Sequence, residues 1–143
     1  FGKYYKGALC MSVTYEFKVR WGDTDAAGIV FYPNFFKWMD EATHEFMLHL
    51  GKKSSEWIKQ ENITIPLLET TCEFKTPLYF EDEVIVTSSV TNVGNKVFTM
   101  EHLFTRNGER IASGKETRAW TSCAGKLKAT PLPEHIKEIM YSL

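Results

Sequence analysis

The sequence predicts an α+β fold in which an antiparallel sheet curls around one long helix. Apolar residues recur every three or four positions between residues 33 and 50, the spacing of an amphipathic helix. Several other stretches alternate polar and apolar residues, and tight turns separate most of them. One helix packed on an antiparallel sheet of this kind is an α+β arrangement.

A first strand is expected over residues 15–21. Its apolar positions alternate with charged ones and define one buried face, formed by Tyr15, Phe17, Val19 and Trp21. Glycines and aspartates between residues 22 and 28 end this strand.

The long helix is expected from about Pro33 or Asn34 to Leu50. Proline suits a first turn because its missing N–H would have no intrahelical partner, and Asn34 is an alternative N-cap. The apolar stripe consists of Phe35, Met39, Ala42, Phe46 and Leu50, widened by Phe36, Thr43 and Met47. Charged residues fill much of the other side, and Gly51 is expected to stop the helix.

The rest of the chain is predicted to form strands and two short helices. In order, they are a short helix at residues 54–60, strands at residues 68–75, 84–90, 98–104 and about 110–123, and a short C-terminal helix that follows Pro131 and Pro133 and ends near Leu143. Gly94-Asn95 is expected to form a tight turn, and Asn107-Gly108 is a strong signal for a type I′ hairpin. His102 falls on an apolar strand face, which favours a hydrogen-bonded core histidine over a metal ligand.

Length and composition indicate one globular domain. The chain has 143 residues with 43% hydrophobic and 24% charged residues, and we place the domain at residues 11–143. Residues 1–10 are treated as a possible non-native or flexible N-terminal extension. The 17 lysines and arginines are scattered and the net charge is −1, so no nucleic-acid partner is expected. No apolar run approaches a membrane span.

The cysteines and histidines argue against disulfide and metal chemistry. There are three cysteines, an odd number without CxxC spacing, which fits a reducing compartment and a cytoplasmic location. Cys72 and Cys123 lie in alternating runs and are expected to be inert core thiols. The histidines lack metal-ligand spacing, so no metal is expected.

The most informative segment is residues 21–34. It places Asp23 and Asp25 in a turn of small residues that runs directly into the start of the long helix. A carboxylate beside the N–H groups of a helix start supplies an attacking group next to a site for negative charge. Asp23 is expected to be a structural turn carboxylate.

This segment resembles the hotdog fold, specifically the 4-hydroxybenzoyl-CoA thioesterase family and related acyl-CoA thioesterases. The matching residues read Gly-Asp-Thr-Asp-Ala-Ala-Gly-Ile-Val-Phe-Tyr-Pro-Asn from position 22, followed by Trp-Met-Asp-Glu-Ala from position 38. A weaker match extends through residues 74–84. Element order agrees from Met11 onward, so the resemblance covers essentially the whole chain.

The resemblance implies roles for particular residues. The family's catalytic carboxylate corresponds to Asp25, and its thioester carbonyl is polarised by a main-chain N–H near Tyr32, itself expected beside the substrate. Pro33 has no N–H to donate, so the donor precedes or follows it. Lys96 corresponds to a position used for CoA phosphate contact, although Gly94 and Asn95 stand where several relatives have basic residues.

The implied activity is hydrolysis of an acyl-CoA thioester to a carboxylic acid and CoA, with no cofactor. Asp25 would act as nucleophile or general base. The resemblance also implies a homodimer or homotetramer with the site between subunits. Phe31, Phe35 and Phe36 suit an aromatic or an aliphatic acyl group equally well.

Three alternatives remain open. The substrate carrier is either CoA or acyl-carrier protein. A non-catalytic acyl-CoA-binding module would share the fold without turnover. A hotdog hydratase usually has an Asp–His pair near the helix start, and here no histidine follows Asp25 until His44, which weakens that option.

Overall fold

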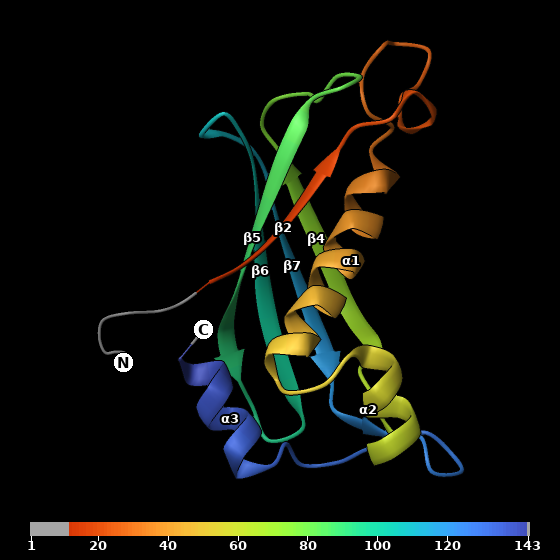
Figure 1. Cartoon of the computed structure of the whole chain (residues 1–143), viewed down its shortest axis with the longest axis vertical. Helices are drawn as coiled ribbons and strands as arrows, with labels where there is room; N and C mark the ends of the chain where they lie inside the picture. The colour runs from red at the N-terminus through yellow and green to blue at the C-terminus, as the bar shows by residue number, and fades with distance from the viewer. Residues whose placement is uncertain (1–11, 143) are drawn as a thin grey trace.

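The computed structural model describes residues 12–142 and confirms the α+β prediction (Figure 1). Residues 1–11 and 143 lie outside it, and with them the proposed extension and Cys10. The elements in order are β2 (Val13–Lys18), η1 (Trp21–Asp23), α1 (Pro33–His49), α2 (Ser54–Glu61), β3 (Ile63–Thr64), β4 (Leu67–Phe74), β5 (Glu83–Val93), β6 (Val97–Arg106), β7 (Glu109–Ala119), β8 (Thr121–Ser122), β9 (Lys128–Ala129) and α3 (Glu134–Tyr141).

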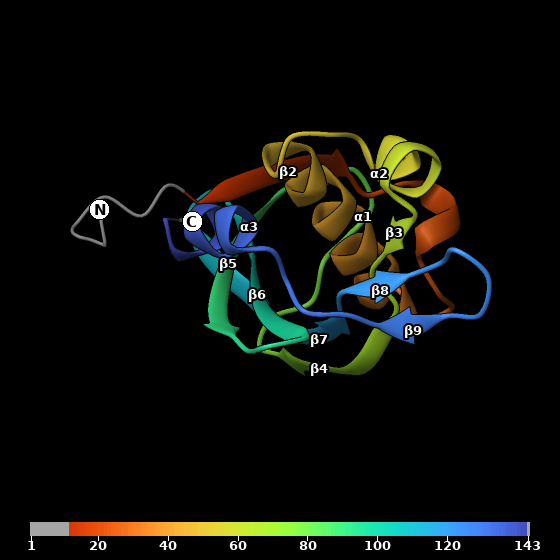
Figure 2. The same cartoon turned by 90° about the horizontal axis from the view of Figure 1, so that it is seen from below.

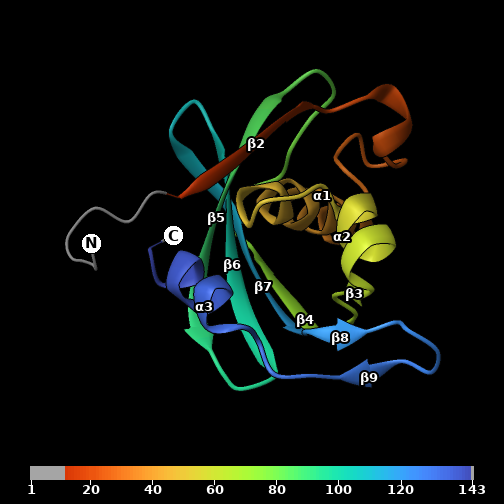
Figure 3. The same ribbon diagram turned by 60° about the horizontal axis from the view of Figure 1, so that its bottom comes forward.

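Five strands form the main sheet, in the order β2-β5-β6-β7-β4, and every pairing is antiparallel. The sheet curves so that α1 lies in its concave face (Figure 3). Strands β2 and β4 are the two edges of this sheet. The arrangement is the hotdog fold.

Helix α1 begins at Pro33 and buries the stripe that its periodicity predicts. Phe35, Met39, Ala42, Phe46 and Leu50 are all at most 4% exposed. Gly51 follows with φ +122°, a conformation that favours glycine and ends the helix. The helix packs tightly on the sheet at Gly114 of β7, where a Cβ would lie 2.5 Å from the Met39 sulfur.

Both predicted hairpin turns are present. Asn107 and Gly108 have φ values of 51° and 79° between β6 and β7, as a type I′ turn requires at both central positions. The Gly94 amide donates to the Val97 carbonyl at 2.7 Å, which closes the turn between β5 and β6.

Some boundaries differ from prediction. Strand β2 ends at Lys18, and Trp21 is 73% exposed instead of buried, because a 3-10 turn begins there and rotates the side chain off the strand face. The long strand expected to Cys123 is interrupted at Trp120. A small second sheet, β3-β8-β9, lies beneath α2 (Figure 2); its strands have two residues each, too few to show a period.

The two described cysteines, Cys72 and Cys123, are free and half-buried. Cys72 packs against the core beside α1, which agrees in part with the expectation of a core thiol, whereas Cys123 is not a core residue. Burial and the neighbouring Glu73 carboxylate raise the pKa of the Cys72 thiol to about 11, which keeps it protonated and weakly nucleophilic. None of the described helices is long and apolar enough to cross a bilayer.

Candidate active site

The segment between η1 and α1 folds into a closed loop with Asp25 on its first arm. The Asp25 amide donates to the Ile29 carbonyl at 2.9 Å, and the Phe31 amide donates to the Asp23 carbonyl at 2.8 Å. Gly28 closes the tip with φ +80°, and its amide donates to the Asp25 carbonyl at 2.9 Å. These bonds bring the Asp25 backbone next to the segment that enters the helix.

The two aspartates of the loop differ in their environment. The Asp23 carboxylate accepts a hydrogen bond from the Arg20 amide at 2.8 Å, which fits the expected structural role. The Asp25 side chain is exposed in the single chain, and its Oδ1 accepts a hydrogen bond from the Ala27 amide at 2.9 Å. No other described residue bonds the Asp25 carboxylate, so Oδ2 is available to a substrate or a water.

One main-chain donor is left over where α1 begins. The amides of Asn34 and Phe35 donate to carbonyls three positions earlier, at 3.0 and 3.1 Å, and the Phe31 amide bonds the loop. Pro33 has no N–H. Among residues 31–35, only the Tyr32 amide lacks an acceptor within the described part of the chain. An unpaired main-chain N–H is therefore available just before Pro33, at one of the two positions that the sequence leaves open for a donor.

A cavity of about 350 Å³ lies beside this helix start. Its lining residues are Ile29, Val30, Tyr32, Phe35, Phe74, Lys75, Thr76, Pro77 and Leu78. The Phe35 and Phe74 rings meet edge to face with centroids 5.0 Å apart, and Tyr32 approaches Phe74 in the same way at 6.4 Å. The Asp25 side chain is not part of this lining in the single chain.

The cavity lining differs from the residues that the sequence suggests for contact with an acyl group. Of the three phenylalanines named from the sequence, only Phe35 lines the cavity; Phe31 is 49% exposed, and Phe36 packs against the core. Phe74 and Lys75 were missed as site residues, although they begin the segment of residues 74–84 that carries the weaker family match.

Lys96 does not meet Asp25 within one protomer. It lies in the turn between β5 and β6, where its carbonyl accepts a hydrogen bond from the Trp120 amide at 2.8 Å. That turn is at the end of the molecule where α1 finishes, whereas the Asp25 loop is at the end where α1 begins (Figure 1). The two residues can serve one ligand only if a second subunit brings its own turn to the helix start.

A second cavity, of about 470 Å³, opens at the same end as Lys96, between α2 and the segment before α3. Trp57 and Trp120 line it. Its lysine, Lys52, is already engaged, because Nζ lies 3.8 Å from Glu61 and 5.8 Å from the centre of the Trp57 ring. The Lys52 ammonium is therefore not free to bind an anionic ligand in this cavity.

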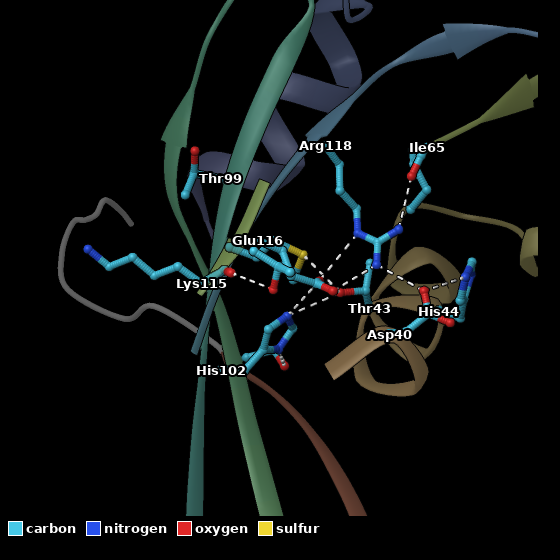
Figure 4. Close-up of polar contacts among 12 residues, drawn as sticks. Asp40, Thr43, His44, Ile65, Thr99, His102, Lys115, Glu116 and Arg118 are labelled. Atoms are coloured by element: carbon cyan, nitrogen blue, oxygen red, sulfur yellow. Dashed lines mark hydrogen bonds and ion pairs between the residues drawn. The ribbon is translucent and has the colours of Figure 1, made fainter. Parts of the chain in front are cut away.

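Periodicity did not reveal a buried cluster of polar side chains between α1 and the sheet (Figure 4). Its members, at most 4% exposed, are Thr43, Ser88, His102, Glu116 and Arg118. His102 Nε2 lies 2.9 Å from Glu116 Oε1, and Arg118 Nη2 donates to Glu116 Oε2 at 2.8 Å. The Thr43 hydroxyl donates to the same carboxylate. His102 is therefore the hydrogen-bonded core histidine that its position predicts.

The cluster reaches the surface through Asp40. Arg118 Nη2 also donates to Asp40 Oδ1 at 2.9 Å, and Nη1 donates to the Ile65 carbonyl at 2.9 Å. Burial alone would raise the pKa of Glu116, but hydrogen bonds from His102 and Arg118 outweigh it and hold that pKa at about 2. Glu116 is thus ionised, and its charge is balanced by Arg118.

Ser88, His102 and Glu116 are connected in the order of a serine-hydrolase triad. Ser88 Oγ lies 2.7 Å from His102 Nδ1, on the ring edge opposite Glu116. Each of the three residues is at most 1% exposed, and none lines the cavities described above. Because no substrate carbonyl can reach Ser88, this chain of hydrogen bonds is structural.

Comparison with known proteins assigns the family. The profile of the "Thioesterase-like superfamily" matches residues 19–140. The chain belongs to this superfamily. It is similar to a solved gentisyl-coenzyme A thioesterase, with 46% identity, a TM-score of 0.78, and coverage of 89% of this chain and 98% of that one. The expected hotdog thioesterase is thereby confirmed at the level of the family.

Two further relatives show how far the similarity extends. A 1,4-dihydroxy-2-naphthoyl-CoA hydrolase from Thermosynechococcus vestitus is 28% identical over 99 residues, which is 68% of each chain. The solved 4-hydroxybenzoyl-CoA thioesterase from Pseudomonas sp. strain CBS-3 has a TM-score of 0.83 at 23% identity, over 90% of this chain and 98% of that one. The second of these establishes the shared fold.

Proposed function

We propose that this thioesterase hydrolyses an acyl-CoA thioester, with Asp25 as the catalytic carboxylate and the Tyr32 amide as the oxyanion donor. The observation that carries the proposal is the unpaired Tyr32 N–H at the start of α1, joined by a short closed loop to an exposed carboxylate. An attacking group and an oxyanion site are what acyl transfer requires from a protein.

The oxyanion donor has the electrostatics that the reaction needs. Negative charge develops on the carbonyl oxygen as the tetrahedral intermediate forms, and the positive end of the α1 dipole faces it. Removing one such donor in other hydrolases costs about 3–4 kcal/mol of transition-state stabilisation. The Tyr32 amide lies one residue before Pro33, so no following N–H competes for the same oxygen at that position.

Asp25 has two chemically balanced routes to the same products. In the first, its oxygen attacks the carbonyl carbon, CoA leaves as the thiolate, and water then hydrolyses the mixed anhydride. In the second, Asp25 takes a proton from water, the hydroxide attacks the carbonyl carbon, the C–S bond breaks, and the proton passes from Asp25 to the leaving CoA thiolate. Both routes release a carboxylic acid and CoA and restore the carboxylate.

The acyl group that fits best is an aromatic one. The cavity beside the helix start is walled by the rings of Tyr32, Phe35 and Phe74, and edge-to-face packing favours a flat aromatic guest. The similar proteins are named for gentisyl, 4-hydroxybenzoyl and 1,4-dihydroxy-2-naphthoyl thioesters. We therefore propose a hydroxylated aryl-CoA as the substrate class.

We further propose a homodimer that pairs through β4. This edge strand exposes apolar side chains, with Leu67, Leu68 and Phe74 at 44%, 58% and 49%; such an edge invites a partner strand. Antiparallel pairing of two β4 strands about a two-fold axis brings Lys96 of the partner subunit to the end at which α1 begins. The CoA phosphates would then meet the partner's lysine.

Thiol release from a panel of thioesters tests the function. We expect hydrolysis of gentisyl-CoA and 4-hydroxybenzoyl-CoA, with hexanoyl-CoA and 4-hydroxybenzoyl-acyl-carrier protein as the comparison substrates. Asp25→Asn should reduce kcat by roughly 10²–10⁴-fold while the affinity for 4-hydroxybenzoyl-CoA persists. Glu45→Gln, an exposed carboxylate on α1, is the matched control. Binding without turnover in the wild-type dimer would identify a binding module instead.

A further inference from the structure

Among the described residues, Asn34 makes the only side-chain hydrogen bond between the loop of residues 23–31 and the first turn of α1. Its Nδ2 donates to the Asp23 carbonyl at 2.9 Å, across eleven positions of the sequence, and the bond is half-buried. The same carbonyl accepts the Phe31 amide at 2.8 Å. One acceptor therefore ties together both arms of the loop and the helix.

Helix capping does not account for this side chain. Asn34 is the second residue of α1, and the N-cap position belongs to Tyr32. A capping asparagine accepts a hydrogen bond from a helix amide through its side-chain oxygen, whereas Asn34 donates outward through its nitrogen. Asparagine inside a helix is also a poor helix former, so the helix itself gains little from it.

We infer that Asn34 is a positioning residue that sets Asp25 relative to the Tyr32 amide. The bonded carbonyl belongs to the residue two positions before Asp25, and Asn34 lies two positions after Tyr32. The hydrogen bond from Asn34 to the Asp23 carbonyl, called the clamp below, thus links the segment that carries Asp25 to the segment that carries the Tyr32 amide. The inference rests on the proposed function, which assigns the chemistry to those two groups. Loss of the clamp lets the carboxylate arm move while the helix stays packed on the sheet.

The test is steady-state hydrolysis of 4-hydroxybenzoyl-CoA by Asn34→Ala and by Asn34→Asp, which keeps the size but has no N–H to donate. We expect kcat to fall by about 10–100-fold, because small misplacements of a reacting group cost that much, while KM changes by less than about threefold. Thr24→Val is the matched control: it removes a hydrogen bond of 2.7 Å from the same loop to the Trp21 carbonyl, without a link to the helix, and should keep kcat within about twofold.

A double mutant separates positioning from general support of the fold. In an Asp25→Asn background, Asn34→Ala should change the residual rate by less than about twofold, because groups that act as a unit are not additive. A further fall of the same size as in the wild type would overturn the inference. Failure of both Asn34 variants to fold would also overturn it, since Asn34 would then serve the fold.

The rates of Asp25→Asn and Asn34→Ala test the proposed function and the positioning role separately. If Asp25→Asn turns over at the wild-type rate, the proposed function itself is wrong. If Asp25→Asn is inactive and the folded Asn34→Ala keeps the wild-type kcat, the proposed function stands and the positioning role is wrong.

Discussion

His102 and Glu116 face each other across neighbouring strands, with Nε2 and Oε1 2.9 Å apart and both side chains at most 2% exposed. Glu116 is ionised and can only accept, so His102 Nε2 carries the hydrogen, and Nδ1 faces the Ser88 hydroxyl. A buried ionic group thus lies within a core that consists mainly of aliphatic, methionine and aromatic side chains.

Acid should destabilise the protein through Glu116. Its pKa is about 2 in the folded chain against an ordinary value of 4.5, so the carboxylate stabilises the fold fully above about pH 5. That contribution, about 3 kcal/mol, is lost as the pH falls toward 2. Urea unfolding between pH 7 and 2 measures it. Glu116→Gln should be less stable at pH 7 and should show a shallower acid dependence; an equally steep one would contradict this assignment.

Removing the buried cation should cost more than removing the whole pair. Arg118→Met leaves Glu116 without its balancing charge, and breaking a buried pair on one side costs about 3–5 kcal/mol. In Arg118→Met combined with Glu116→Leu, no buried carboxylate is left unpaired, and part of the loss should be recovered. Urea denaturation of the wild type, Arg118→Met, Glu116→Leu and the double variant checks this. A double variant as unstable as the sum of the single variants would argue that the two side chains act independently.

Replacing the buried Ser88 should leave the thioesterase activity unchanged. Ser88→Ala removes the hydroxyl at the end of the Ser88-His102-Glu116 chain of hydrogen bonds, but each member is at most 1% exposed and cannot contact a substrate. We expect kcat for 4-hydroxybenzoyl-CoA within about twofold of the wild type and a stability loss of about 1 kcal/mol from the lost hydrogen bond. A rate loss matching that of Asp25→Asn would move the chemistry to the core.

Gly114 should be sensitive to size because of Met39. A Cβ at this position would lie 2.5 Å from the Met39 sulfur and 3.2 Å from the Thr71 carbonyl oxygen. The Met39 side chain is flexible but fully buried, so Gly114→Ala should cost about 1–3 kcal/mol from overpacking. Met39→Ala combined with Gly114→Ala should recover part of that loss relative to the sum of the single changes. Thermal unfolding of the wild type, both single variants and the double variant gives the coupling free energy between the two positions. Changes in stability that simply add would contradict a contact between Gly114 and Met39.

A charge on the β4 edge should separate the subunits of the proposed dimer. Leu68 is 58% exposed on β4, and Ile58, 46% exposed on α2, is a matched control away from that edge. Leu68→Asp should halve the mass measured by light scattering and should lower thioesterase activity at the same time. Ile58→Asp should change neither. A monomeric wild-type protein with full activity would remove the need for a partner subunit.

Local patterns predicted the elements that are long or chemically distinctive. The stripe from Phe35 to Leu50 identified α1, and Asn107-Gly108 identified a hairpin, because each needs only neighbouring residues to be recognised. The break at Trp120 and the two-residue strands arise from tertiary packing and leave no period in the sequence.

For the candidate site as well, local sequence predicted the segments that are close in the chain but not the contacts that depend on the tertiary structure. The run of residues 21–34 located the loop and the helix start, but the pairing of Asn34 with the Asp23 carbonyl depends on how the loop closes. Glu116 and Arg118 carry charges that usually face solvent, whereas in the structure both lie on the buried face of β7, the face that carries Gly114. The separation of Lys96 from Asp25 likewise follows from the topology, since the two residues belong to connections at opposite ends of the sheet.

The salt-bridged core also fixes the register of α1 on the sheet. Phenylalanine and methionine side chains tolerate sliding, whereas Thr43 and Asp40 must reach Glu116 and Arg118. A slip of one helical turn, about 5.4 Å, would break both of these hydrogen bonds to α1, although Glu116 and Arg118 would keep each other as partners. These two hydrogen bonds therefore fix where α1 lies along the sheet, and with it the position of the Tyr32 amide at the start of the helix.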